Sequence, residues 1–240
     1  MAVMQNSITF GGVSSASYGI YIGGEGVFNA PARDVEMISI PGRDGTLAID
    51  NGRFENISVT YTVINFESDL ATFAQNLAAF RNALCSQKGY QRLTDTFHTD
   101  EYRMAAFIGG FEVKPIEYNT AAEFEITFDC KPQRFLTSGE TVTTMTGSGS
   151  ITNPTQFESK PLLVVTGTGT LTVNGTSITF SASPTTVDCE SMEAYNGTTS
   201  RNGSITLGNG TFPVLSPGSN SISKTSGISQ VKITPRWWRV

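Results

Sequence analysis

The chain has 240 residues, of which 15% are charged, well below the ~25% of a typical soluble domain, and its formal net charge is −5. Residues 1–135 carry 10 Lys and Arg against 16 Asp and Glu, net −6, and residues 136–240 carry 6 against 5, net +1. Neither half has the clustered basic stripe that nucleic-acid binding needs, no run approaches the ~18 apolar residues of a membrane span, and no secretory signal is visible, so these classes are not expected.

A turn with a charged tip is the first distinctive motif. In "SIPGRDGTLAIDNG" the pair Pro41 and Gly42 favours a turn, and Arg43 and Asp44 are adjacent opposite charges at its tip. On the residues alone this is a solvated loop.

Two segments of the first half are predicted strands, because apolar and polar residues alternate over 56–63 and 122–130. Between them, apolar residues recur every three or four positions and predict one amphipathic helix over 68–89. Ser68 is its expected cap and Gly89 its expected end. The residues expected to form the helix stripe are Leu70, Phe73, Leu77, Phe80 and Leu84.

Two kinds of side chain in the sequence, cysteine and histidine, can carry reactive chemistry. Cys85, Cys130 and Cys189 have no metal-ligand spacing, so buried free thiols are predicted. His98, the only histidine, has Asp95, Asp100 and Glu101 around it. It is either a general base oriented by a carboxylate or a polar loop residue, and the lack of a recognisable nucleophile favours the loop.

The second half is predicted to be all-β. A Thr, Ser and Gly-rich linker is expected over 137–149, dividing an α+β first half from this region. Asn-Gly pairs begin at positions 174, 196, 202 and 209 and favour hairpin turns over glycosylation sites. The clearest hairpin is "LTVNGTSITF". Asp188 and Glu190 share one face if they lie on a strand, as glycosidase carboxylates could, but two acids alone are weak evidence and an enzyme is not predicted.

Both tryptophans lie in the last eight residues, "ITPRWWRV". Alternation places Val231 and Ile233 on the inner face of a final strand. Continued past Pro235, it turns Trp237 inward into the core of the second domain, unless a bulge at the proline exchanges the two tryptophans. Trp238 then points outward with Arg236, where it stacks on the guanidinium or is covered by the first domain or a neighbouring molecule.

Eight segments in this order resemble the distal tail protein family of bacteriophages with long flexible tails. They are "ITFGGVSS", "IPGRDGTL", "GYQRLTD", "FDCKPQRFLTSGE", "NPTQFESKPLLVVTGTGTLTVNG", "DCESMEAY", "FPVLSPGSNSIS" and "ITPRWW". The resemblance runs from about Ser7 to Trp238. Thr99 departs from it, because the resemblance implies a proline after His98.

The resemblance implies a mainly β protein of two domains. Residues 1–136 would form a tail-tube-like β-sandwich with one packed helix, which closes into a six-fold ring, and residues 137–240 a galectin-like β-sandwich. Arg43 and Asp44 become candidates for the ring interface, and Trp238 and Arg236 for an interdomain or partner-facing surface.

The implied function is structural. The ring would be a hub of the tail tip or baseplate in the virion, assembled in the bacterial cytoplasm, with a channel for DNA. Its partners would be further copies of the chain, the major tail tube protein, the tape measure protein, the tail-associated protein or lysin, and receptor-binding proteins, without a cofactor, a metal or a membrane. The alternative is an adhesin that binds cell-wall carbohydrate through exposed Trp or Tyr residues.

Overall fold

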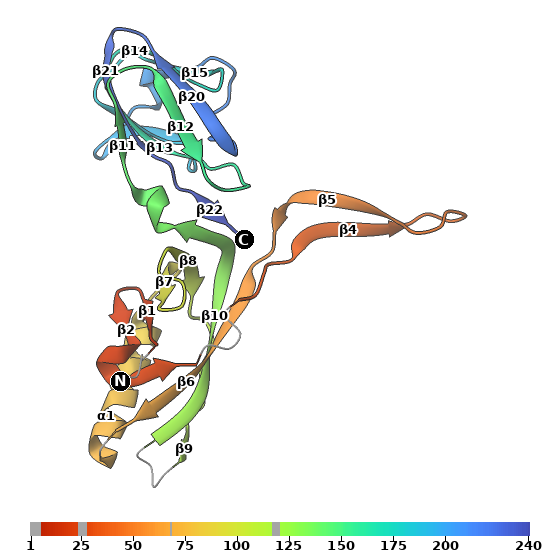
Figure 1. The fold of residues 1–240 in the computed structure, drawn as a ribbon, viewed down its shortest axis with the longest axis vertical. Helices are drawn as coiled ribbons and strands as arrows, with labels where there is room; N and C mark the ends of the chain where they lie inside the picture. The colour runs from red at the N-terminus through yellow and green to blue at the C-terminus, as the bar shows by residue number, and fades with distance from the viewer. Residues whose placement is uncertain (1–5, 24–27, 68, 117–120) are drawn as a thin grey trace. The chain divides into compact units, whose positions relative to one another are not determined.

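The computed structural model describes residues 6–23, 28–67, 69–116 and 121–240 (Figure 1). The chain forms two compact units, Met1–Arg134 together with Val240, and Phe135–Arg239. Strands dominate both, and the described residues contain a single α-helix, so the predicted mainly β fold class is confirmed. The helix lies in the first unit.

The first unit is a curled antiparallel sheet with the helix packed on it, plus a separate hairpin. The strand order is β2-β1-β7-β8-β10-β6-β3, with β9 also paired to β10, while β4 and β5 pair with each other. The elements are β1 (Ile8–Phe10), β2 (Val13–Ser14), the 3-10 helix η1 (Ser15–Tyr18), β3 (Ile20–Ile22), β4 (Arg33–Ser39), β5 (Thr46–Phe54), β6 (Ile57–Phe66), α1 (Leu70–Ser86), β7 (Gln91–Asp95), β8 (Glu101–Ala106), β9 (Lys114–Ile116) and β10 (Ala121–Leu136).

Strands β6 and β10 form the centre of the first core. They pair antiparallel with Val63 opposite Phe124, and Val59 opposite Phe128. Directly opposed side chains share a face, so the two alternating patterns add their apolar residues to one buried layer. Tyr61 and Ile126, opposite each other in the same register, are also buried.

Helix α1 closes this core with one face, as its spacing predicts. Phe73, Phe80 and Leu84 are buried, and Leu77 packs against them in part. Two details differ from the sequence prediction. Ser68 lies outside the described residues and the cap is Asp69, whose carboxylate accepts from the Thr72 amide at 2.9 Å. Leu70, the first residue of the helix, is 53% exposed and does not belong to the core.

The second unit is a sandwich of two antiparallel sheets, with strand orders β11-β21-β13-β16-β17-β18 and β12-β20-β14-β15-β19. Its elements are η3 (Thr137–Glu140), β11 (Thr143–Met145), β12 (Gly149–Asn153), β13 (Leu162–Gly167), β14 (Gly169–Val173), β15 (Thr176–Phe180), β16 (Thr185–Asp188), β17 (Glu193–Asn196), β18 (Thr199–Ser200), η4 (Asn202–Ser204), β19 (Ile205–Leu207), β20 (Gly218–Lys224), β21 (Ile228–Thr234) and β22 (Trp238–Arg239).

The two sheets of the sandwich enclose one apolar core. Leu163, Val165 and Val187 come from the first sheet, and Leu171 and Phe180 from the second. The expected hairpin "LTVNGTSITF" forms β14 and β15, and Asn174 and Gly175 turn the chain with φ of 48° and 85°. Positive φ at both central residues is what a type I′ turn needs, and Asn-Gly tolerates it.

Three sequence predictions for the rest of the chain need correction. The segment expected as a linker is structured, because Thr143 and Met145 pair with β21 and extend its sheet. Threonine favours strands, so a Thr-rich segment beside an open sheet edge joins it. Asn202 begins the 3-10 helix η4 instead of a hairpin turn, and Asn209 lies in a turn between β19 and β20, which do not pair with each other. Cys85 is exposed, whereas Cys130 and Cys189 are buried as expected.

Candidate functional site

The β4–β5 hairpin of the first unit exposes more apolar surface than a free strand pair normally does. β4 and β5 form a two-stranded sheet that no other strand joins among the described residues. In Figure 1, β5 leads into β6 and the hairpin extends away from it. Met37 is 60% exposed, Ile38 37%, Leu47 42% and Ile49 41%. Isolated two-stranded hairpins are marginal in water, and apolar exposure on this scale marks an interaction surface.

The register divides the hairpin into two unlike faces. Ile38 lies opposite Leu47, and Glu36 opposite Ile49, so these four side chains share one face. The three apolar residues of this face, Ile38, Leu47 and Ile49, are called the aliphatic face below. The opposite face is mixed, and consists of Val35, Met37, Ser39, Thr46, Ala48 and Asp50.

Ion pairs hold the base of the hairpin together. Arg33 Nη1 donates to Asp50 Oδ2 at 2.8 Å, and Arg53 Nε donates to Asp34 Oδ2 at 2.6 Å. The Asn51 amide, followed by Arg53, holds the pKa of Asp34 below its ordinary value. Hydrogen bonds from the Gly52 amide and from Arg33 hold the pKa of Asp50 below its ordinary value, although desolvation acts in the opposite direction. Solvent-exposed pairs of this kind contribute little stability individually, but they fix the cross-strand register.

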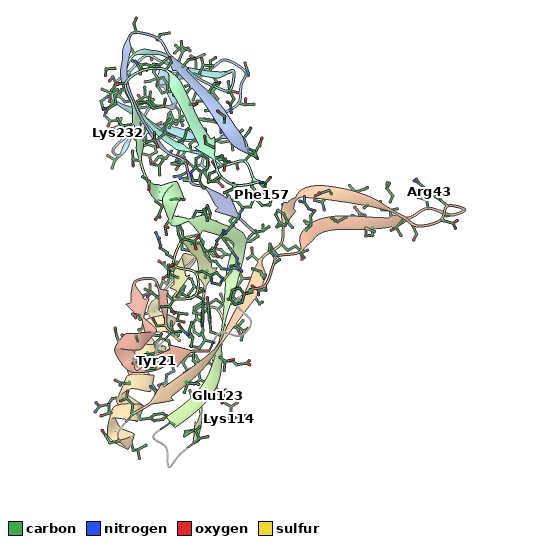
Figure 2. All side chains as sticks on the ribbon, viewed as in Figure 1. Tyr21, Arg43, Lys114, Glu123, Phe157 and Lys232 are labelled. Atoms are coloured by element: carbon green, nitrogen blue, oxygen red, sulfur yellow. The ribbon has the colours of Figure 1, made fainter. Side chains whose placement is uncertain are left out.

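The predicted interface candidates Arg43 and Asp44 lie at the tip of the hairpin, where Figure 2 labels Arg43. Gly42 and Gly45 flank them with φ of 78° each, a conformation that favours glycine. Both charged side chains are exposed, and the tip turn is held by the Arg43 amide donating to the Ile40 carbonyl at 3.2 Å. The sequence prediction missed the aliphatic face behind this tip, although its signal is the alternation in "VEMISI" and "TLAID".

The C-terminal tryptophans lie in different surroundings within the second unit. Trp237 is 5% exposed and belongs to the same core as Val231 and Ile233. Trp238 is half-buried and stacks on Phe157, with ring centroids 4.4 Å apart and planes at 21°, while its Nε1 donates to the Glu158 carbonyl at 2.8 Å. β21 is the last strand of the two sandwich sheets, as expected, and Trp238 and Arg239 form the short strand β22 after it.

Arg236 does not stack on Trp238, although this stacking was one of the two expected arrangements. Its φ of 58° breaks the alternation after Pro235 and turns the guanidinium toward Asp188. The two groups form a bidentate pair at 2.7 and 2.8 Å. This hydrogen bonding lowers the pKa of Asp188 and raises that of Arg236. Glu190 pairs instead with Lys160 at 3.5 Å, so the two acids have separate partners.

A hollow of about 350 Å³ lies at the β17–β18 edge of the sandwich. Its lining is polar with one aromatic ring, and consists of Glu193, Ala194, Tyr195, Gly197, Thr198, Ser200 and Asn202. The Asn202 Oδ1 accepts the Ala194 amide at 2.6 Å, which anchors that side chain at the rim. Hydroxyl, amide and carboxylate groups beside an aromatic ring are the chemistry that binds a neutral polar molecule.

Other candidate chemistry is used structurally. His98 is half-buried, and its Nδ1 lies 3.0 Å from Asp95 Oδ1, while Asp95 Oδ2 accepts from the Tyr61 hydroxyl at 2.9 Å. Within the described ranges, no group of three or more His, Cys, Asp or Glu side chains could hold a metal ion. The single helix of those ranges is not long and apolar enough to cross a membrane.

Comparison with known proteins gives matches only to solved structures. No protein-family model matches the sequence, and no curated protein matches it. The Dit protein of phage SPP1, described as a paradigm of the hub adsorption apparatus in phages infecting Gram-positive bacteria, superposes with a TM-score of 0.71 at 12% identity, covering 98% of this chain and 99% of that one.

Two structures of the phage P2 baseplate in its activated conformation also match. The one with Ca superposes with a TM-score of 0.52 at 12% identity and covers 97% of this chain and 98% of that one. The one with Sr gives 0.51 at 13% identity, covering 100% and 99%. The resemblance stated from the sequence is thus confirmed at the level of the fold, and this chain shares its fold with a phage distal tail protein over nearly its entire length.

Proposed function

We propose that this chain is a structural protein of a phage tail tip, a hub that forms a six-fold ring between the tail tube and the host-adhesion apparatus. The observation that carries the proposal is the uncovered β4–β5 hairpin on a chain whose whole length matches a phage hub protein in fold. A free monomer gains nothing from exposing Ile38, Leu47 and Ile49 to water, whereas a ring subunit buries them.

The ring interface is heterologous, because cyclic assembly joins one surface patch to a different one on the next copy. The aliphatic face supplies the patch on one side of this interface, and burying it stabilises the ring at roughly 25 cal/mol per Å². The receiving surface belongs to residues 1–136 of the next copy, with Arg43 and Asp44 at or beside the seam. Low overall charge, 15% of residues, agrees with a surface that is covered in the virion.

A ring of this kind also has an electrostatic consequence for DNA passage. Residues 1–135 carry a net charge of −6, so six copies would concentrate about 36 negative charges. A channel wall that repels phosphate lets DNA slide, which is the opposite of the counterion release that drives tight binding. A structure of the assembled ring with a basic channel wall would contradict this part of the proposal.

In this role the chain has a non-enzymatic function in the virion after assembly in the host cytoplasm. Its neighbours would be the tube protein and tape measure protein on one side, and the tail-associated protein and receptor-binding proteins on the other. Residues 137–240 would form the galectin-like domain, with Trp238 and Arg236 near its end. The pairing of Arg236 with Asp188 and of Trp238 with Phe157 supports an anchoring role for both within that domain.

The test compares two charged substitutions on the two faces of the hairpin. Ile38→Asp places a carboxylate on the aliphatic face, and Ser39→Asp places the same group on the other face one residue away. Light scattering and negative-stain images should show rings for the wild type and for Ser39→Asp, and subunits for Ile38→Asp. Equal assembly of both variants would overturn the assignment of the aliphatic face. Arg43→Glu tests the tip, and rings of unchanged stability would remove Arg43 from the seam.

A second candidate function is carbohydrate binding at the β17–β18 hollow, favoured by its polar lining and by Tyr195. In this case the chain would be retained on immobilised host cell-wall glycan, and Tyr195→Ala would lose the retention. Tyr90→Ala is the matched control, because Tyr90 is a 39% exposed tyrosine of the first unit. Rings without retention on the glycan favour the hub, and a monomer that is retained favours the adhesin.

A further inference from the structure

The direction in which the hairpin leaves the sheet depends on how its two legs are attached. The β5 leg runs into β6 after only two residues, so chain continuity fixes it. The β4 leg has no such continuity, and its root is the segment 28–32. One backbone bond joins the two legs here, from the Glu55 amide to the Ala32 carbonyl at 2.9 Å.

Asn29, in this root segment, is held from three strands of the sheet. Arg134 Nη2 on β10 donates to the Asn29 carbonyl at 3.1 Å, and Arg103 Nη2 on β8 donates to Asn29 Oδ1 at 3.4 Å. The side-chain Nδ2 of Asn29 donates to the Ser58 carbonyl on β6 at 2.9 Å. The backbone and both ends of the side-chain amide are therefore occupied.

The arginines that hold Asn29 are themselves buried. Arg103 is 7% exposed and Arg134 8%, and Arg134 Nη1 forms an ion pair with Glu101 Oε1 at 2.7 Å. Burying guanidinium groups costs free energy unless they are well paired. Burial and the neighbouring Arg134 charge lower the pKa of Arg103. The Nη1 atom of Arg103 has no hydrogen-bond partner among the described residues. Because burying these guanidinium groups costs free energy, we look for a role in positioning the residues that they bind.

We propose that Asn29 is a positioning residue, and that Arg103 and Arg134 clamp it so that the β4–β5 hairpin leaves the sheet in one direction. The direction matters only if the aliphatic face must meet a neighbouring copy, so the consequence for assembly rests on the proposed function. The clamp itself concerns one chain and can be measured in one chain. A hairpin with a fixed direction presents its face without the entropy loss of ordering it on binding.

The experiment measures the direction of the hairpin by pulsed electron paramagnetic resonance between two spin labels. Cys85 on α1 is exposed and takes one label, and Asp44→Cys at the hairpin tip takes the other, while Cys130 and Cys189 are buried. Labelled chain is diluted into unlabelled chain, so that only distances within one chain contribute. A single narrow distance distribution is expected, and a broad one for the otherwise unchanged chain would overturn the proposal.

Substitutions at Asn29 then separate the clamp from general stability. Asn29→Ala, or Asn29→Ser if the alanine variant does not fold, should lose the single narrow distribution. Asn29→Asp should keep it, because a carboxylate accepts a stronger, charge-assisted bond from Arg103 even though the donor to Ser58 is lost. Asn76→Ala is the control, since it removes a side-chain bond to Glu67 of 2.6 Å near α1.

The outcomes are distinct. A narrow distribution in Asn29→Ala or Asn29→Ser means that the Asn29 side chain does not set the direction, which would refute its role as the positioning residue. A distribution in Asn29→Asp as broad as in Asn29→Ala would assign the effect to the Ser58 bond and exclude Arg103, because Arg134 donates to the backbone carbonyl that every variant keeps. Because every distance is measured within one chain, failure of ring assembly leaves this result unaffected, and failure of the clamp leaves the ring to be judged by Ile38→Asp.

Discussion

Two hairpins of this chain have similar apolar alternation and opposite surroundings. In β14–β15 the apolar residues Leu171, Val173, Ile178 and Phe180 are at most 2% exposed, because the opposite sheet of the sandwich covers them. In β4–β5 the aliphatic face is 37% to 42% exposed, because the chain itself supplies no second layer. The comparison teaches that a strand pattern predicts a buried face without saying which molecule buries it.

The largest expected effect concerns the covered core. Trp237→Ala should lower the free energy of unfolding of the second unit by about 3 to 5 kcal/mol, because it empties a buried aromatic site in the core that also contains β14–β15. Denaturant titration followed by circular dichroism measures this change.

Trp238→Ala is the matched control for that substitution. Trp238 is half-buried, so its removal loses one stacked ring and one hydrogen bond, and about 1 to 2 kcal/mol is expected. Unchanged stability in both variants, with equal iodide quenching of the remaining indole in each, would mean that both tryptophans are exposed.

The second prediction tests the comparison directly with one substitution in each hairpin. Ile178→Ala should destabilise the chain by about 2 to 5 kcal/mol, because the side chain is fully buried. Ile38→Ala should change the stability of the unassembled chain by less than about 0.5 kcal/mol, because Ile38 is 37% exposed on a hairpin that no second sheet covers. Thermal melts under conditions that keep the chain monomeric give both values. A large loss from Ile38→Ala in the monomer would show that the hairpin is covered within its own chain.

The fold follows from sequence where one local pattern decides it. Helix α1 is predictable from the spacing of Phe73, Phe80 and Leu84, and the β14–β15 turn from Asn174 and Gly175, since each depends on neighbours in sequence. The cap fell one residue later than expected, because Asp69 and Ser68 are both good capping residues and only the backbone path selects between them.

The parts that sequence reasoning missed depend on contacts distant in sequence. The expected linker became β11 because β21, nearly 90 residues later, offers it an open edge. Arg236 was expected beside Trp238, but Asp188 is 48 residues away in sequence and hydrogen-bonded to it in space. The same holds for the candidate site: Arg43 and Asp44 were visible as a turn, whereas the aliphatic face needed the β4–β5 register.

The third prediction concerns the Asp188–Arg236 pair, which fixes the end of the chain to the covered sandwich. Asp188→Asn should cost about 1 to 2 kcal/mol of stability near neutral pH, because it removes a charge-assisted bidentate bond. The folded pKa of Asp188 is lowered, so its contribution is complete above the unfolded pKa of about 3.9 and is lost as the pH falls through the folded value.

Urea titrations of the wild type and Asp188→Asn across this pH range measure the contribution. The difference in stability between the two proteins should shrink below about pH 4 and vanish once Asp188 is protonated in the folded state. A difference that is constant over the whole range would assign the effect to packing and not to the charge.

The smallest expected effect is a difference in thiol reactivity between the cysteines, which leaves the stability of the chain unchanged. Cys85 is exposed, whereas burial raises the pKa of Cys130 and of Cys189 to about 12, so little thiolate forms at either. A thiol reagent should therefore modify Cys85 at once and the two buried cysteines only when their cores open.

Cys130 lies in the first core and Cys189 in the second, so each reports one unit. In Trp237→Ala, peptide mapping should find Cys189 modified sooner and Cys130 at the wild-type rate. If both accelerate equally, the two units open together, and the sandwich that covers β14–β15 is not an independent unit of stability.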